Sequence, residues 1–408
     1  MGGLRLLAMV TVSGVALSTL TVPEPLPGIA PEAPCPALEV DRPVGLPTPP
    51  EPPPGHSPGD RQLGGAALAA AELVIPETAP TPPPLTATTW LVADLDSGAV
   101  LGACGPHEYA IPASTQKLLL AAALMSELDP DEVVEVVPED LDIVPGSSAV
   151  GLLVGGRYTI ETLWLGLMLN SGNDAANVLA RLGGGEDGVA GGLALMNAEA
   201  QRLGAYQTFA ATPSGLDGPG QYTSAYDLAL IARPLFDRED FLDYVGADRA
   251  AIPPQPPQDP RGFEIQNDNG LLLNYPGALG GKTGFTDLAR HSFVGAAQRD
   301  DRRLVVTVLG AEAQPLTGWQ QAAELLDWGF ALPAEAAVGR LVEPEELAAV
   351  ASSSTEPPVE PAGSAGGEAA AALAPGRTWA TAAVAATALL LSGVFAALAY
   401  RSARRRRG

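Results

Sequence analysis

The chain has 408 residues and a formal net charge of −24 at pH 7, with 40 prolines and 46 glycines. A surface this acidic repels a phosphate backbone, which argues against nucleic acid as a partner. Proline and glycine concentrate outside the middle of the chain, so we expect one folded body rather than two domains.

The N-terminal part has two sections. Residues 1–22 contain one early charge, Arg5, and then an apolar stretch, which is typical of a secretory signal peptide. The cleavage site is unclear, so an uncleaved anchor remains an alternative. Residues 23–87 are rich in proline and poor in aromatic and β-branched residues, which predicts a disordered arm. Outside the cell, Cys35 and Cys104 could form a disulfide that pins this arm to the body, but two cysteines alone leave their pairing open.

The range 88–330 carries the hydrophobic periodicity of a folded domain. Residues 88–104 predict a strand, a turn and a second strand. Several helical runs follow, and then "HSFVGAAQ" and "RRLVVTVLGA" predict another hairpin before the closing helix "WQQAAELLDWGFA". With strands at both ends and helices between, the sequence predicts an α+β domain whose antiparallel sheet is built from both ends, with a helical subdomain between them.

The C-terminal part predicts a membrane anchor. Residues 331–376 have the composition of a flexible linker. We expect a transmembrane helix over 377–400, because residues 379–400 are uncharged and long enough to span a bilayer. Residues 401–408 hold an arginine cluster that marks the cytoplasmic side, whereas a buried core helix would rarely end in four arginines. The body is then expected outside the cell, tethered to the membrane by its C-terminus.

Only two of the 23 basic residues are lysines, Lys117 and Lys282. In "STQK", Ser114 lies three residues before Lys117, so on a helix that begins near Ser114 both side chains share one face. A serine hydroxyl becomes a good nucleophile when a base takes its proton, and lysine can be that base if burial or neighbours lower its pKa. The alternative is a helix-capping serine beside a solvated lysine.

Two further stretches favour the first interpretation. "NSGND" places Ser171 and Asn173 between two predicted helices, where a loop could present a hydroxyl and an amide to one site, although helix capping is the alternative. In "GGKTG", Lys282 and Thr283 offer an ammonium and a hydroxyl to an anionic group, and the glycines allow close approach. The three histidines show no metal-ligand spacing.

S-x-x-K, S-x-N and K-T-G in this order resemble the penicillin-binding and serine β-lactamase superfamily, most closely its D-alanyl-D-alanine carboxypeptidase branch. The resemblance covers roughly residues 86–330 and includes "LVADLDSGAVL" and "LMLNSGNDAANVLA". It departs from the branch in the "LLL" after Lys117 and in "LARHSF". It implies a β-lactamase/transpeptidase-like fold, peptidoglycan stem peptides ending in D-Ala-D-Ala as substrates, β-lactams as covalent inhibitors, and no metal or other cofactor.

The resemblance also implies a role for each matching residue. Ser114 would attack the penultimate D-alanine and form an acyl-enzyme, Lys117 would take its proton, and Ser171 would relay a proton to the leaving amine. The backbone N–H groups of Ser114 and Phe285 would form the oxyanion hole. The predicted substrate-binding residues are Asn173, Lys282, Thr283, Gly284 and Phe285.

Two other functions stay open on the sequence. A serine β-lactamase shares the nucleophile, but class A enzymes add a glutamate in an E-x-x-x-N stretch, and nothing clearly of that form follows Asn173. An inactive envelope protein that binds muropeptides is the other alternative, and intact Ser114 and Lys117 argue against it. Release of D-alanine from a D-Ala-D-Ala peptide distinguishes the three.

Overall fold

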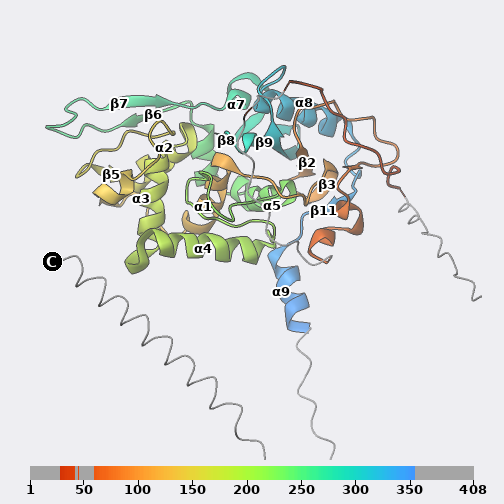
Figure 1. The fold of residues 1–408 in the computed structure, drawn as a ribbon, viewed down its shortest axis with the longest axis horizontal. Helices are drawn as coiled ribbons and strands as arrows, with labels where there is room; N and C mark the ends of the chain where they lie inside the picture. The colour runs from red at the N-terminus through yellow and green to blue at the C-terminus, as the bar shows by residue number, and fades with distance from the viewer. Residues whose placement is uncertain (1–27, 42–44, 46–58, 354–408) are drawn as a thin grey trace, which may run out of the picture. The chain divides into compact units, whose positions relative to one another are not determined.

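The computed structural model describes residues 28–41, 45 and 59–353 (Figure 1). The expected signal peptide, transmembrane helix and basic tail lie outside these residues. Within the part of the chain that is described, no helix is both long and apolar enough to cross a membrane.

A seven-stranded antiparallel sheet lies at the centre of the fold. Its strand order is β1-β3-β2-β10-β9-β8, and β11 also pairs with β3. The two ends of the domain meet where β10 pairs with β2, with Val306 opposite Val92. The predicted α+β class and the sheet built from both ends are therefore confirmed. The strands of this sheet are β1 (Leu73–Val74), β2 (Thr89–Asp94), β3 (Ala99–Cys104), β8 (Ala278–Thr286), β9 (Arg290–Arg299), β10 (Arg302–Ala311) and β11 (Gly339–Arg340).

Most of the helices lie in sequence between β3 and β8, as the helical subdomain was expected to. Two small hairpins, β4-β5 and β6-β7, accompany them. The α-helices are α1 (Lys117–Leu124), α2 (Ile160–Leu169), α3 (Asn173–Gly183), α4 (Gly188–Leu203), α5 (Ala225–Phe236), α6 (Glu239–Gly246), α7 (Gly270–Asn274), α8 (Gly318–Ala331) and α9 (Pro344–Ser353). The hairpin strands are β4 (Val133–Glu135), β5 (Arg157–Thr159), β6 (Arg249–Ile252) and β7 (Phe263–Gln266), and the 3-10 helices are η1 (Asp60–Gln62), η2 (Ala66–Ala69), η3 (Ala113–Gln116), η4 (Pro138–Leu141) and η5 (Gly185–Asp187).

Both faces of the sheet are covered, which explains why its central strands are apolar throughout rather than alternating (Figure 1). Successive side chains of a strand point to opposite faces, so Val305 packs in one core cluster and Val306 in the other. The Val305 face carries α5, and the Thr307 hydroxyl on that strand donates to the Ala225 carbonyl at 2.9 Å. The Val306 face packs against α8 through Leu325. The sheet is thus the middle of three layers.

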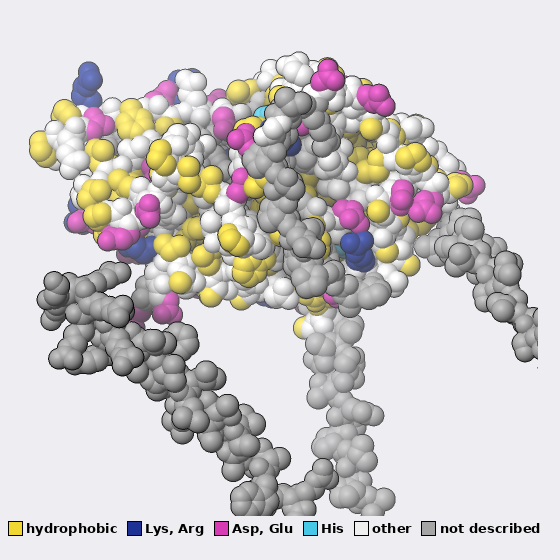
Figure 2. Space-filling model, viewed as in Figure 1, with side chains coloured by type: hydrophobic (Ala, Val, Ile, Leu, Met, Phe, Trp, Pro, Cys, Tyr) yellow, Lys and Arg dark blue, Asp and Glu magenta, His cyan; other side chains and the backbone are white. Residues whose placement is uncertain are grey.

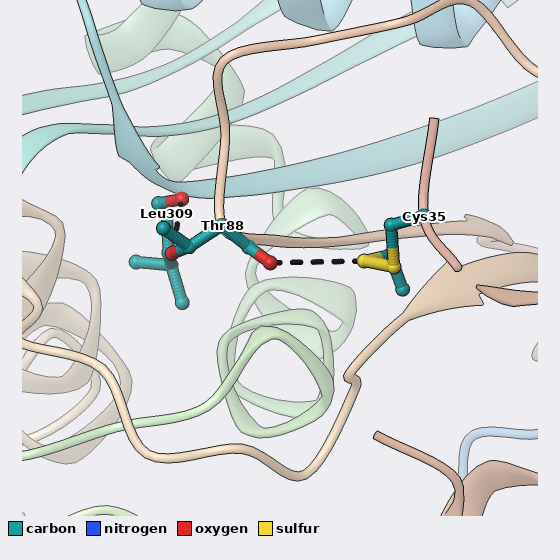
Figure 3. Close-up of a disulfide and its surroundings, with 4 residues drawn as sticks. Cys35, Thr88 and Leu309 are labelled. Atoms are coloured by element: carbon teal, nitrogen blue, oxygen red, sulfur yellow. Dashed lines mark hydrogen bonds between the residues drawn. A yellow bond between two sulfur atoms is a disulfide. The ribbon is translucent and has the colours of Figure 1, made fainter. Parts of the chain in front are cut away.

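The prediction of a disordered arm over 23–87 is wrong for the residues of that range that the structure describes. β1 pairs with β3 at the sheet edge, and residues 28–41 in turn bridge to this segment at Ala33 and Leu73. Cys35 and Cys104 form a disulfide, and Cys104 Sγ lies 3.6 Å from the Thr88 carbonyl oxygen (Figure 3). The disulfide and the pairing of β1 with β3 offset the entropy cost of ordering this segment. Composition alone reveals neither.

The flexible linker expected from residue 331 begins too early as well. Leu332 and Leu341 are buried in the core, and β11 between them pairs with β3. The folded body therefore extends past the predicted boundary at 330 to α9. The rest of the expected linker, from residue 354, lies outside the described residues.

One face of the described body carries its charge in a dispersed form (Figure 2). On the face shown in Figure 2, acidic side chains are scattered and basic ones stand singly, so this face has no continuous basic strip.

Candidate active site

Ser114 lies on η3, the short 3-10 helix that leads directly into α1. The preceding residue, Ala113, has a φ of 48°, a backbone conformation that is uncommon for a residue with a side chain. Two hydroxyls fix this turn, because Thr115 and Ser292 both donate to the Pro112 carbonyl at 2.6 Å. Since Ser292 belongs to β9, the nucleophile loop is held against the sheet.

Lys117 is fully buried, and its Nζ lies 2.9 Å from Ser114 Oγ. The same nitrogen lies 2.8 Å from Asn173 Oδ1 and 2.7 Å from the Ser214 carbonyl oxygen. Burial lowers the pKa of Lys117 well below its usual value, and the charge of Lys282 lowers this pKa further. Its amine can therefore be neutral where an exposed lysine is charged, as a base beside a hydroxyl must be.

The S-x-N loop joins α2 to α3 and brings the Ser171 hydroxyl to the site. Ser171 has a φ of 63°, and its buried Oγ has no hydrogen-bond partner among the described residues. An unpaired buried hydroxyl is costly and is a frequent mark of a functional position. One residue after Asn173, the Asp174 carboxylate accepts the N–H groups of Val150, Gly151 and Leu152 at 2.8 to 3.0 Å, which fixes the facing loop.

The K-T-G motif lies on β8, the edge strand of the sheet. Lys282 is buried, and its Nζ lies 3.1 Å from the Thr283 carbonyl oxygen and 3.4 Å from Thr283 Oγ1. Burial lowers the pKa of Lys282, whereas the nearby Asp268 carboxylate raises it. The Thr283 hydroxyl also donates to Asp268 at 3.3 Å.

Gly284 shows why the motif needs its glycine. A Cβ at this position would lie 2.9 Å from the Ser114 nitrogen and 2.3 Å from Ser292 Oγ. The first is a backbone atom and the second is held by its bond to the Pro112 carbonyl, so any larger residue would push β8 away from the nucleophile loop. The glycine thus permits the close approach of the two motifs.

A cavity of about 380 Å³ gathers the predicted residues. Ser114, Ser171, Asn173, Thr283, Gly284 and Phe285 line it. The two predicted lysines do not line this cavity but lie buried, with Lys117 bonded to Ser114 and Lys282 to Thr283. Three motifs that are more than 50 residues apart in sequence therefore converge on one hollow.

Other residues at the site were not found by sequence reasoning. Ser214 contributes its backbone carbonyl to Lys117, and any residue type has that group, so the sequence carries no signal for it. Asp268 lies between β7 and α7, outside every motif, although it bonds to Thr283 and lines the cavity. His291 also lines the cavity. Among the residues described, no group of three His, Cys, Asp or Glu side chains is placed to hold a metal ion.

Comparisons with known proteins agree on what the chain resembles. The sequence model described as D-alanyl-D-alanine carboxypeptidase matches residues 76–313. The D-alanyl-D-alanine carboxypeptidase DacB2 of Mycobacterium tuberculosis is 46% identical over 260 residues, which cover 62% of this chain and 86% of that relative. The D-alanyl-D-alanine carboxypeptidase DacD of Salmonella typhimurium is 34% identical over 265 residues, or 62% of this chain and 64% of that relative.

Solved structures give the same picture. The crystal structure of D-alanyl-D-alanine carboxypeptidase from Mycobacterium tuberculosis H37Rv matches with a TM-score of 0.61 and 43% identity, over 65% of this chain and 99% of that one. The Streptomyces K15 DD-transpeptidase matches with a TM-score of 0.59 and 28% identity, over 62% of this chain and all of that one. The sequence model thus matches most of the folded body and leaves the chain before residue 76 and after residue 313 outside the match.

Proposed function

Since this chain belongs to the D-alanyl-D-alanine carboxypeptidase family, we propose that it removes the terminal D-alanine from peptidoglycan stem peptides through an acyl-enzyme on Ser114. The observation that carries this proposal is the buried Lys117 amine, 2.9 Å from Ser114 Oγ. When the lysine is deprotonated, the serine is the nucleophile and the lysine is a base already in contact with it.

Acylation follows from this contact. Neutral Lys117 takes the Ser114 proton as Oγ forms a bond to the carbonyl carbon of the penultimate D-alanine. The carbonyl oxygen becomes an oxyanion, which the backbone N–H groups of Ser114 and Phe285 stabilise. The amide C–N bond then breaks, and the leaving amine needs a proton. Ser171, whose hydroxyl has no partner among the described residues, would relay the proton from Lys117 to this amine, which leaves as D-alanine.

The K-T-G motif binds the C-terminal end of the substrate. Lys282 and Thr283 receive the C-terminal carboxylate, because an ammonium and a hydroxyl next to each other match a carboxylate's two oxygens. A bound carboxylate would also favour the charged form of Lys282, against the lowering of its pKa by burial. Asn173 holds the substrate amide and, through its bond to Lys117, orients the base.

Water completes the cycle by hydrolysing the ester on Ser114, and Lys117 serves again as the base. Each step uses protein groups and water. β-Lactams react at the same serine, because their lactam carbonyl takes the place of the scissile amide, and the ring-opened product stays attached to Oγ. The protein is thus expected to bind penicillin covalently.

The test is to incubate the full chain with a fluorescent penicillin and map the labelled peptide. We expect the label on Ser114 and its complete loss in Ser114→Ala, together with release of D-alanine from a D-Ala-D-Ala peptide by the unchanged chain. A label on another serine would refute the site assignment. Penicillin hydrolysis without D-alanine release would instead favour a serine β-lactamase, and neither reaction would indicate a binding protein without turnover.

We also propose that the catalytic body lies on the outer side of the cell membrane and is anchored by residues 377–400. The uncharged run followed by arginines supports this orientation. Protease added to intact cells should digest the body, and truncation after Ala374 should release it from the membrane fraction. Protection from the protease would contradict the orientation, and retention of the truncated chain would indicate an uncleaved N-terminal anchor.

A further inference from the structure

A buried ion pair lies beside the site without taking part in the mechanism above. Arg290 begins β9, and Glu312 follows the end of β10. The pair is bidentate, with Arg290 Nε 3.1 Å from Glu312 Oε1 and Nη2 2.9 Å from Oε2. The two side chains are only 14% and 8% exposed. A planar guanidinium held at two points has a fixed position and orientation.

Glu312 is a rigid anchor for this pair. Its backbone N–H donates to Thr86 Oγ1 at 2.9 Å, and its carbonyl accepts from Gln321 Nε2 at 3.1 Å. Gln321 also donates to Thr86 Oγ1 at 2.7 Å, and both of these side chains are buried. The backbone that carries this carboxylate is therefore held by two hydrogen bonds, one to Thr86 and one from Gln321 of α8.

Arg290 has an unusual backbone conformation. Its φ is +57°, in the left-handed region that a residue with a side chain rarely enters. It lies opposite Thr286 in the β8-β9 register, at the end of the hairpin. The Thr286 hydroxyl closes the turn by accepting from the Ala289 N–H at 2.9 Å. The turn and the ion pair together determine where the guanidinium lies.

The guanidinium lies over the Phe285 ring, with Cζ 5.3 Å from the ring centroid. The Phe285 ring also lies 4.7 Å from the His291 ring, centroid to centroid. Phe285 lines the active-site cavity and is 49% exposed, so much of its ring faces solvent. A half-exposed ring on an edge strand needs such contacts to stay in one position.

We propose that Arg290 is a positioning residue for catalysis: anchored by Glu312, it holds the Phe285 ring and thereby fixes the Phe285 N–H in the oxyanion hole. The inference rests on the proposed function, which gives that N–H its role. An oxyanion hole works because its donors are in place before charge develops. Loss of the clamp should therefore slow bond formation at Ser114 while leaving the initial, non-covalent binding of the ligand little changed.

The test uses Arg290→Lys in the full chain, which keeps the charge but loses the planar bidentate contact. Stopped-flow acylation by a fluorescent penicillin separates the non-covalent dissociation constant from the acylation rate constant. We expect the rate constant to fall about tenfold, less than the 10²- to 10³-fold cost of removing an oxyanion donor outright, with the dissociation constant changed less than twofold.

β9 offers a matched control at its other end. Arg299 also forms an ion pair, with Asp327, and its guanidinium lies over Tyr275 at 5.2 Å. Tyr275, unlike Phe285, does not line the active-site cavity. Arg299→Lys should leave both constants at wild-type values. An equal loss in this control would mean that lysine substitution merely loosens the strand, and the proposal would fail.

A double-mutant cycle tests the route through Phe285. In a Phe285→Leu background the ring is gone, so Arg290→Lys should cost less than a further twofold. Full multiplication of the two effects, or wild-type acylation by Arg290→Lys, overturns the proposal. If circular dichroism shows Arg290→Lys unfolded, Glu312→Gln provides the same test, because it weakens the anchor and leaves the backbone bonds of residue 312. Failure of the proposed function would look different, since the wild-type chain would then take no label on Ser114.

Discussion

Lys117 and Lys282 are equally buried, yet their amines face different surroundings. Lys117 Nζ has three oxygen partners within 2.9 Å, from Ser114, Asn173 and Ser214. Lys282 Nζ contacts only the neighbouring Thr283 among the partners described, at 3.1 and 3.4 Å. Hydrogen bonds to three other residues hold the Lys117 amine in place, whereas the Lys282 amine can still donate hydrogen bonds to a ligand.

The pKa shifts of the two lysines also have different causes. The charge on Lys282 helps to lower the pKa of Lys117, so the anion-binding lysine favours the neutral form of the base. The shift of Lys282 comes from burial, against which Asp268 acts to keep the charge. Two lysines in one site can thus divide the work, one giving up its proton and the other keeping it.

The largest effect should come from Lys117→Arg. A base must spend part of the cycle neutral, and a guanidinium with a pKa above about 12 cannot do so near pH 7. Loss of a general base typically costs about 10²- to 10⁴-fold, and crowding around Ser114 adds to this loss. Penicillin acylation and D-alanine release should both fall by that factor, in a protein that circular dichroism shows to be folded.

Lys282 should respond to substitution in the opposite way. Its task is to supply positive charge to a carboxylate, which arginine can also do, often with two hydrogen bonds. Lys282→Arg should keep measurable D-alanine release with an altered KM, while Lys282→Ala should lose most of its activity. Equal and mild effects of arginine at positions 117 and 282 would contradict the division of labour, because the proton of Ser114 would then need another route.

The sequence predicts the local geometry of this site better than its wider surroundings. Ser114 and Lys117 share a helix face by spacing alone, and the structure places them in contact. That Ser171 and Thr283 line the same cavity depends on tertiary packing, which only the resemblance to a family suggested. The Ser214 carbonyl and Asp268 left no trace, because one is a backbone group and the other belongs to no motif.

The ends of the body were misjudged for a different reason. Composition measures how much apolar surface a segment can bury by itself, and the proline-rich arm can bury little. Residues 28–41 are instead ordered by contacts with the rest of the chain, through the Cys35–Cys104 disulfide and a bridge to Leu73. The short β11 likewise gains its place by pairing with β3. Such long-range partners do not appear in a local window of sequence.

The smallest effect should come from Asp268, whose carboxylate acts on both lysines. It raises the pKa of Lys117 and that of Lys282. Asp268→Asn removes the charge and keeps an acceptor for the Thr283 hydroxyl. Removal of a negative charge near an amine disfavours the protonated form, so both pKa values should fall. The base gains from this change and the anion-binding lysine loses, so one substitution separates the two roles.

The pH profile of acylation should show this separation. Lys117 must be neutral to act, so acylation rises with pH through the pKa of Lys117, and Asp268→Asn should move this acid limb to lower pH by about half a unit. Because Lys282 holds its charge less well, KM for the peptide should rise about two- to threefold at neutral pH. This shift of the acid limb should shrink at high ionic strength, since Asp268 is exposed to solvent and salt screens its charge.

Asp287→Asn is the matched control. Asp287 is an exposed acid on the β8-β9 turn and does not line the cavity. The pH profile of this variant should coincide with that of the wild type. A limb that moves to higher pH in Asp268→Asn, or a KM that falls, would mean that the carboxylate does not act through the charges of the two lysines.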